Sequence, residues 1–269
     1  MRHSCKVQPF GGAPVFALLV FSKVEVMGVD LCVLDFLLKL PDRRFGETLC
    51  LGRQGIHITE NMRLMARQLV AEWNPTATLE KLIGNTGYAE TLFKQLGSTD
   101  VKSLDYSDYE GADLVFDLND PIPGHLKERF DTVFDGGTLE HVYNFPIAID
   151  NAKAMARTGG RVMMISPANN FAGHGLYQFS PELLYRVFSA ENGFQVELMQ
   201  LVEVGSFPRP QPMEDPRSAG RRIEFMTRMP AYLCVSARKV RGSVTEQVQQ
   251  SDYTRVWAHH AERNATRKL

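Results

Sequence analysis

FDTVFDGGTLEHVYNF, residues 130–145, decides the fold of this chain. Its apolar start predicts a short strand that ends at Asp135, and two glycines then let the backbone turn sharply. Thr138 is a candidate N-cap, and apolar residues recur at helical spacing after Asn144. The stretch therefore predicts a strand, a polar turn and a helix.

The following segment, which runs on to Phe188, repeats this order. After a Gly-Gly turn, the apolar run RVMMI, residues 161–165, is typical of a strand buried on both faces, as in a parallel sheet. The polar loop NNFAGHGLYQF then leads to Ser180-Pro181-Glu182, which is a favourable helix start. Both strands end in polar residues, and open α/β sheets bind ligands at that edge.

Three earlier strands are predicted at residues 47–51, 101–104 and 112–116. A glycine-containing turn at Gly52 follows the first strand, Asp105 ends the second and Asp117 ends the third. Each acidic residue alone also suits a turn. Together with Asp135 they favour a nucleoside-like ligand, because a carboxylate at such a strand end accepts hydrogen bonds from both hydroxyls of a ribose.

Helices and further strands complete the pattern. Helices are expected around residues 31–38, 59–72 and 76–98, strands at 194–204 and 231–236, and a proline-rich loop at 206–217 that is either a lid or a stiff surface loop. We predict three parts: an N-terminal extension and helix (1–46), a ligand-binding domain (47–240) and a C-terminal helical tail (241–269).

Composition narrows the class of protein. The net charge is −1, with 30 Lys and Arg against 31 Asp and Glu and no basic block, so a nucleic-acid footprint is not indicated. The four cysteines are scattered and form no CxxC pair, so the sequence predicts neither a zinc site nor a disulfide framework. This pattern fits a reducing, cytoplasmic location. His57 and Glu60 with His141 also lack standard ligand spacing, so no metal is predicted.

The N-terminal residues form no membrane span. The apolar run at residues 14–21 is too short to cross a bilayer, and no clear signal-peptide cleavage site follows it. Both Met1 and Met27 are candidate starts, because the periodic pattern becomes regular just after Met27. The sequence makes no prediction of oligomeric state.

The strand order and acidic strand ends resemble those of class I S-adenosylmethionine-dependent methyltransferases over about residues 47–239. The phrases LGRQGI, GYAE, SDYEGADLVFDLNDPIP, FDTVFDGGTLEHVYNFP and NNFAGHGLYQFSPELLYRVF resemble a bacterial, methyltransferase-like branch of that superfamily. The resemblance implies a Rossmann-like, doubly wound α/β fold. Its seven-stranded sheet is mostly parallel with an antiparallel last strand, and a crevice opens between strands one and four.

The resemblance also implies a cofactor site for S-adenosylmethionine. Asp105 would bind the ribose, and Asp117 with Leu118 would flank the adenine. Gly52, Arg53 and Gln54 would lie under the methionine part, which Asp135 and Gly136 would line. In the superfamily this turn is usually Gly-x-Gly-x-Gly, but here Gln54 and Ile56 stand at the second and third glycine positions. Gln54 either occupies room that the cofactor needs or supplies a replacement hydrogen bond.

On the acceptor side, the chemistry needs alignment and removal of a proton from an oxygen or nitrogen. Histidine suits that task near neutral pH. The candidate catalytic residues are His174, His141 and Glu140, and Asn170, His174 and Tyr177 are candidate contacts to a small polar or sugar-like acceptor. The alternatives are purely structural roles: Glu140 and His141 would cap the following helix, and His174 would form a hydrogen bond with the backbone of its loop.

Three functions compete at this point. The first is methyl transfer from S-adenosylmethionine to a small-molecule acceptor. The second is a methyltransferase fold that has lost the cofactor and serves as a binding module. The third is non-methyl chemistry, with His57, His141 and His174 as acid–base groups. The acidic strand ends favour the first function, and the altered glycine turn favours the other two.

Overall fold

The computed structural model of the protein describes residues 28–42, 44–205, 207–242 and 248–266. The expectations for residues 1–27, including the choice between Met1 and Met27, lie outside the described residues, as does the start of the predicted C-terminal helix at residues 243–247. Within the described ranges, no helix combines the length and apolarity needed to cross a membrane.

An eight-stranded sheet in the order β3-β2-β1-β4-β5-β8-β6-β7 organises the described chain. Strands β1 to β5 pair in parallel, and β8 is antiparallel to both β5 and β6. The strands are β1 Gly46–Leu51, β2 Ser98–Asp105, β3 Leu114–Val115, β4 Phe130–Asp135, β5 Ala156–Asn169, β6 Phe194–Glu203, β7 Gln211–Pro212 and β8 Ala231–Lys239.

The predicted fold class is confirmed, since the sheet is doubly wound, mostly parallel and has an antiparallel last strand. The predicted count of seven strands is wrong. The eighth strand is β7, two residues of the proline-rich loop that pair with the edge of β6. Such a short pairing leaves no apolar run or alternation for the sequence to show.

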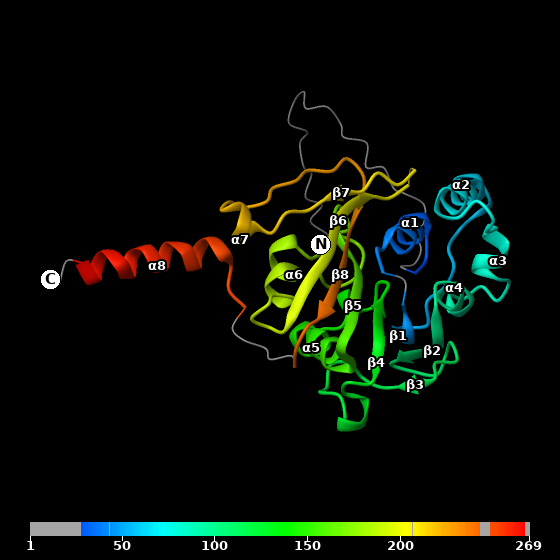
Figure 1. The fold of residues 1–269 in the computed structure, drawn as a ribbon, viewed down its shortest axis with the longest axis horizontal. Helices are drawn as coiled ribbons and strands as arrows, with labels where there is room; N and C mark the ends of the chain where they lie inside the picture. The colour runs from blue at the N-terminus through cyan, green and yellow to red at the C-terminus, as the bar shows by residue number, and fades with distance from the viewer. Residues whose placement is uncertain (1–27, 43, 206, 243–247, 267–269) are drawn as a thin grey trace, which may run out of the picture.

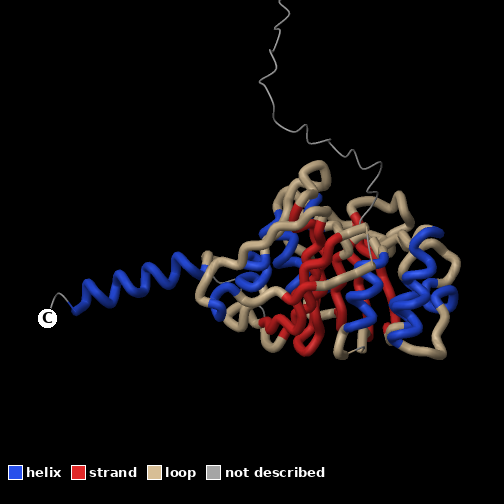
Figure 2. Tube along the Cα trace, turned by 90° about the horizontal axis from the view of Figure 1, so that it is seen from above, coloured by secondary structure: helices blue, strands red, loops and turns tan. Residues whose placement is uncertain are grey.

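Helices cover both faces of the sheet (Figure 1). One face packs α1 Leu31–Lys39, α2 Arg63–Trp73, α3 Leu79–Ile83 and α4 Glu90–Gln95 against side chains such as Phe134 and Met163. The other packs α5 Phe145–Met155 and α6 Pro181–Val187 against Val133, Val162 and Met164. Figure 2 shows the strands between these two helical layers. Because both faces are covered, the central strands β4 and β5 are buried over most of their length rather than at alternate residues.

The structure differs from the predicted elements at two places that contain glycines. The helix predicted over residues 76–98 is interrupted, because Gly84 (φ +68°) and Gly87 (φ +81°) take conformations that end α3 and precede α4. The Gly159-Gly160 turn lies within the bounds of β5, at an irregularity where Phe130 pairs with Ala156 but Thr132 pairs with Arg161.

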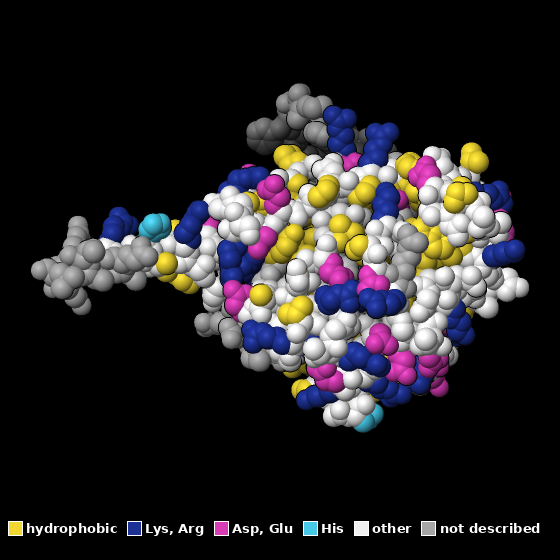
Figure 3. Space-filling model, viewed as in Figure 1, with side chains coloured by type: hydrophobic (Ala, Val, Ile, Leu, Met, Phe, Trp, Pro, Cys, Tyr) yellow, Lys and Arg dark blue, Asp and Glu magenta, His cyan; other side chains and the backbone are white. Residues whose placement is uncertain are grey.

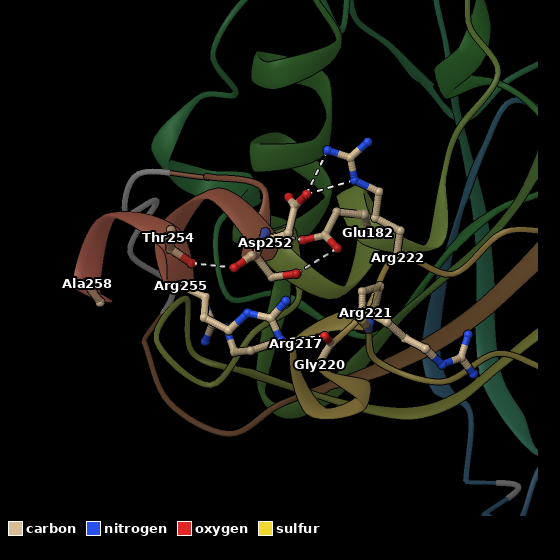
Figure 4. A pocket seen from close by; sticks show the side chains of 11 residues that line it. Glu182, Arg217, Gly220, Arg221, Arg222, Asp252, Thr254, Arg255 and Ala258 are labelled. Carbon is tan, nitrogen blue, oxygen red and sulfur yellow. Dashed lines mark hydrogen bonds and ion pairs between the residues drawn. The ribbon is translucent and has the colours of Figure 1, made fainter. Parts of the chain in front are cut away.

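The helix α8 Ser251–Thr266 extends away from the sheet (Figure 1). The first turn of α8 meets α6 and α7 Pro216–Ala219 around a cavity of about 410 Å³ (Figure 4). Glu182 accepts from the backbone and hydroxyl of Ser251, and Arg222 pairs with Asp252 at 2.7 Å. Arg217 likewise pairs with Glu191. The contacts of Glu182 and Arg222 hold the first turn of α8 against the rest of the chain.

Charged side chains of both signs share the surface (Figure 3). Lys and Arg side chains are interspersed with Asp and Glu side chains over the face shown in Figure 3. Many form pairs, such as Arg67 with Glu80 at 2.8 Å and Arg157 with Glu47 at 3.0 Å.

We expect the N-cap of α1 to make stability depend on pH. Asp30 accepts the N–H of Val33, and burial raises the pKa of its carboxyl to about 6. Because the folded-state pKa is the higher one, the stabilising contribution is complete below about pH 4 and is lost as the pH rises through about 6. Asp30→Asn keeps the capping acceptor but does not titrate.

Relative to wild type, this variant should therefore gain about 1–3 kcal/mol of unfolding free energy between pH 4 and pH 8. Urea unfolding at both pH values measures the gain. A difference that stays constant with pH would contradict this role of Asp30.

Candidate functional site

The carboxyl ends of β1, β2 and β4 meet because the strands pair in parallel. Leu51 is paired with Leu104 on one side and with Asp135 on the other. The next residue of each strand or turn therefore lies at one edge of the sheet, and these residues are Gly52, Asp105 and Gly136. This is the edge at which the resemblance predicts a ligand between strands one and four.

Gly52 takes a positive φ of +72°, and a Cβ there would lie 2.6 Å from Thr138 Oγ1. The same position is 3.9 Å from Asp105 Oδ2. Only glycine combines this backbone angle with this clearance. Asp105 is half-buried, and its Oδ1 accepts the N–H of Tyr106 at 2.6 Å.

Gln54 fills the space beside Gly136. Its side chain is buried, and its Nε2 donates to the carbonyl of Leu51 at 2.6 Å. Its Oε1 has no hydrogen-bond partner within the described chain, and a Cβ on Gly136 would collide with it. The structure therefore has a buried acceptor, unpaired within the described chain, at the position where the resemblance leads us to expect glycine.

Arg53 points away from this gap. Its guanidinium pairs with Glu90 at 2.8 Å, donates to the carbonyl of Glu110 and lies 3.9 Å from the ring centre of Tyr88. The hydrogen bond from Arg53 to Glu90 is the main reason that its pKa is raised. The predicted cofactor residue thus ties the turn after β1 to α4.

Asp135 is fully buried and organises the turn after β4. Its Oδ1 accepts the N–H groups of Thr138 at 2.8 Å and Leu139 at 3.3 Å. Burial, and next the neighbouring Glu140 carboxylate, raise the pKa of Asp135 well above its usual value. The expectation that Thr138 caps a helix through its side chain is wrong, because its hydroxyl donates to the carbonyl of Leu51 instead.

Asp117 and Leu118 follow β3, at the next position along the edge. Asp117 Oδ1 accepts from the backbone and side chain of Asn119, and the buried Leu118 offers its carbonyl to Asn151. Asn119 in turn accepts the N–H of Asn144, at the start of α5. These bonds hold the loop after β3 against α5.

Glu140, His141 and His174 come together, as the sequence could not show. Glu140 and His141 lie in the short 3₁₀ turn after β4, whereas His174 lies in the loop after β5. His174 Nε2 is 3.3 Å from Glu140 Oε1, and His141 Nε2 is 3.9 Å from the same oxygen. His57, by contrast, packs against Gly28 and Gly55, where burial lowers its pKa.

Asn170 and Tyr177 mark the two ends of the loop that carries His174. Asn170 takes a positive φ of +60°, and its side-chain amide donates to the carbonyls of Thr227 and Met229. Tyr177 donates its hydroxyl to the carbonyl of Tyr143 at 2.7 Å. Both predicted substrate contacts are thus hydrogen-bonded to neighbouring loops.

Thr138, which the sequence suggests as an N-cap, instead links the turn after β4 to the end of β1 through its hydroxyl. The signal that could have placed it is the register of β1 against β4, which pairs Leu51 with Asp135 and so brings Thr138, three residues later, within hydrogen-bond distance of the Leu51 carbonyl. That register is a tertiary property.

No protein-family model and no curated protein matches this chain. Among solved structures, it is similar to a 1,6-didemethyltoxoflavin-N1-methyltransferase from Burkholderia thailandensis with bound 1,6-didemethyltoxoflavin and S-adenosylhomocysteine. The sequence identity is 18%, the similarity covers 78% of each chain, and the TM-score is 0.42. It is also similar to a branched-chain polyamine synthase from Thermus thermophilus in complex with N4-aminopropylspermidine and 5'-methylthioadenosine. There the identity is 14%, the coverage is 76% of this chain and 53% of that one, and the TM-score is 0.37. Such distant likenesses say nothing of this chain's ligand, and the fold rests on the strand order itself.

The acidic residues that end β2 and β4 should respond differently to truncation. Asp135→Ala leaves two buried N–H groups without an acceptor, so we expect a loss of about 1–3 kcal/mol of unfolding free energy. Asp105→Ala, at a half-buried position, should change it by no more than about 0.5 kcal/mol. Urea denaturation measures both, and equal losses would show that Asp135 does not organise the turn.

Proposed function

We propose that this chain transfers a methyl group from S-adenosylmethionine to an oxygen or nitrogen of a small polar acceptor. The observation that carries the proposal is the meeting of Gly52, Asp105 and Gly136 at one edge of the sheet, where the strand order reverses between β1 and β4. Because a fold alone does not imply a function, the proposal depends on the chemistry of the residues at this edge.

The residues at the edge fit the cofactor. The Asp105 carboxylate suits two vicinal ribose hydroxyls, and the loop at Asp117 and Leu118 suits the adenine. At the other end, the orphaned Oε1 of Gln54 suits the ammonium group of the methionine part, since a buried acceptor without a donor is costly. When bound, the sulfonium supplies an electrophilic methyl group.

The acceptor side would be formed by Glu140, His141 and His174. His141 is half-exposed, so a small molecule can reach it, whereas Glu140 is fully buried behind it. These residues would orient the acceptor and take its proton, which an oxygen or nitrogen nucleophile must lose. Asn170 and Tyr177 would hold the loop that presents His174.

The setting we propose is a reducing cytoplasm. Cys32, Cys50 and Cys234 are buried and free, as expected for a chain that is not exposed to oxidation. The scattered surface charge favours a small acceptor over a nucleic acid.

One observation favours a second candidate function, a binding module that has lost the cofactor. The buried side chain of Gln54 lies where the superfamily has glycine, and its amide already donates to Leu51. In this reading the side chain closes the gap between β1 and β4.

Calorimetry with S-adenosylhomocysteine tests the proposed function directly. Wild type should bind one equivalent, and Asp105→Ala should weaken binding by about 1–3 kcal/mol, the scale for losing hydrogen bonds to a charged group. Asp108→Ala is the matched control, because Asp108 is an exposed acidic residue of the same loop. Gly52→Val should abolish binding while thermal unfolding stays cooperative. No binding by the wild type would refute the proposal.

Gln54→Gly separates the two candidate functions. If Gln54 Oε1 serves the cofactor, the variant should bind S-adenosylhomocysteine about 5- to 10-fold more weakly, because one hydrogen bond is lost. If the variant binds more tightly than wild type, the Gln54 side chain occupies space that the cofactor needs. That result would favour the binding module that has lost the cofactor. Isothermal titration of the two folded proteins at one pH measures the difference.

A further inference from the structure

Glu140 is a buried carboxylate without a hydrogen-bond donor. Its side chain is 0% exposed, and neither of its oxygens has a hydrogen-bond partner within the described residues. Burying a carboxylate without compensation is so costly that buried charges are almost always paired or bound to a metal. The side chain therefore requires a cation or a proton.

His174 approaches this carboxylate without satisfying it. Its Nε2 is 3.3 Å from Glu140 Oε1, yet the atoms lack the alignment of a hydrogen bond, and this buried nitrogen has no other partner among the residues described. Two polar atoms that are close but misaligned suit a third atom bound between them. His174 Nε2 and the Glu140 carboxylate thus both lack a hydrogen-bond partner within the described residues.

His141 supplies a third atom on the open side. Its Nε2 lies 3.9 Å from Glu140 Oε1, its ring meets that of His174 edge-on at 5.0 Å, and all three ligand atoms lie within 4.8 Å of one another. Ligand atoms bound at about 2.1 Å to one ion are about 3.0–3.4 Å apart. Side-chain rotations of His141 and His174 can close that difference.

The backbone is shaped to hold this arrangement. Leu176 donates its N–H to the carbonyl of Glu140 at 2.8 Å, which draws the loop after β5 onto the turn after β4. Gly175, in the loop after β5, has a φ of +67°, and a Cβ on it would be 2.8 Å from Glu140 Cγ in the turn after β4. Only glycine permits this approach. The cluster is therefore a built site and does not arise from chance surface proximity.

The geometry points to a divalent transition-metal site formed by Glu140, His141 and His174. Two imidazoles and one carboxylate are a ligand set for Fe²⁺, Mn²⁺, Co²⁺ or Zn²⁺, and they leave coordination positions open on the solvent side of His141. The ion neutralises the Glu140 carboxylate. Where the proposed methyl transfer holds, the open positions bind the acceptor oxygen and favour loss of its proton.

Metal binding can be measured without any turnover. Untagged full-length protein is stripped with a chelator and titrated with Zn²⁺, Mn²⁺ and Co²⁺ by calorimetry, and Co²⁺ is followed by its visible absorption. We expect one ion per chain for at least one metal, and a loss of affinity of tenfold or more in His174→Ala and in Glu140→Gln. Glu140→Gln keeps the side-chain volume against Gly175.

His125→Ala is the matched control, since His125 is an exposed histidine on another loop, and it should bind the ion as wild type does. Failure of the wild type to bind any of the three ions, or wild-type affinity in both His174→Ala and Glu140→Gln, overturns the inference. S-adenosylhomocysteine binding by the same stripped protein distinguishes the two claims. Cofactor binding without metal binding overturns the metal site alone, whereas metal binding without cofactor binding overturns the methyl transfer alone.

Discussion

The parallel pairing of β1 between β2 and β4 is the constraint on which this structure depends. Because parallel strands point the same way, their carboxyl ends lie at one edge, and the register sets Leu51 beside Leu104 and Asp135. The residues that follow these strands are then neighbours, although more than eighty positions of sequence separate Gly52 from Gly136. A shift of one residue in either register would turn each side chain of the shifted strand to the other face of the sheet and displace these turns relative to one another.

Buried acidic groups divide into two kinds at this edge. Asp135 accepts hydrogen bonds from backbone donors, which stabilise the turn after β4. Glu140, five residues later, has the same burial but receives no hydrogen bond from the described chain. Burial, and next the Glu140 carboxylate, raise the pKa of Asp135 despite its backbone donors. One carboxylate builds the turn, and the other is available for chemistry.

The turn after β4 takes part in both the sheet edge at Gly136 and the histidine cluster. Gly136 in this turn packs against Gln54, and Glu140 and His141 supply two members of the cluster. Thr138, in the middle of that turn, is bonded to the end of β1. A displacement of the turn would therefore alter both places together, which links the geometry of the proposed cofactor site to that of the proposed metal site.

The sequence by itself determined the alternation of strands and helices and the acidic strand ends, because apolar runs and glycines act locally. The doubly wound topology and the altered glycine turn were predicted from a family resemblance. The sequence also singled out Glu140, His141 and His174 one at a time. Only the tertiary structure decided that these three side chains converge, that Gln54 fills the gap beside Gly136 and that an eighth strand pairs at the edge. The physical reason is that strand register and loop packing bring together atoms far apart in the chain. A sequence carries no local pattern for such contacts.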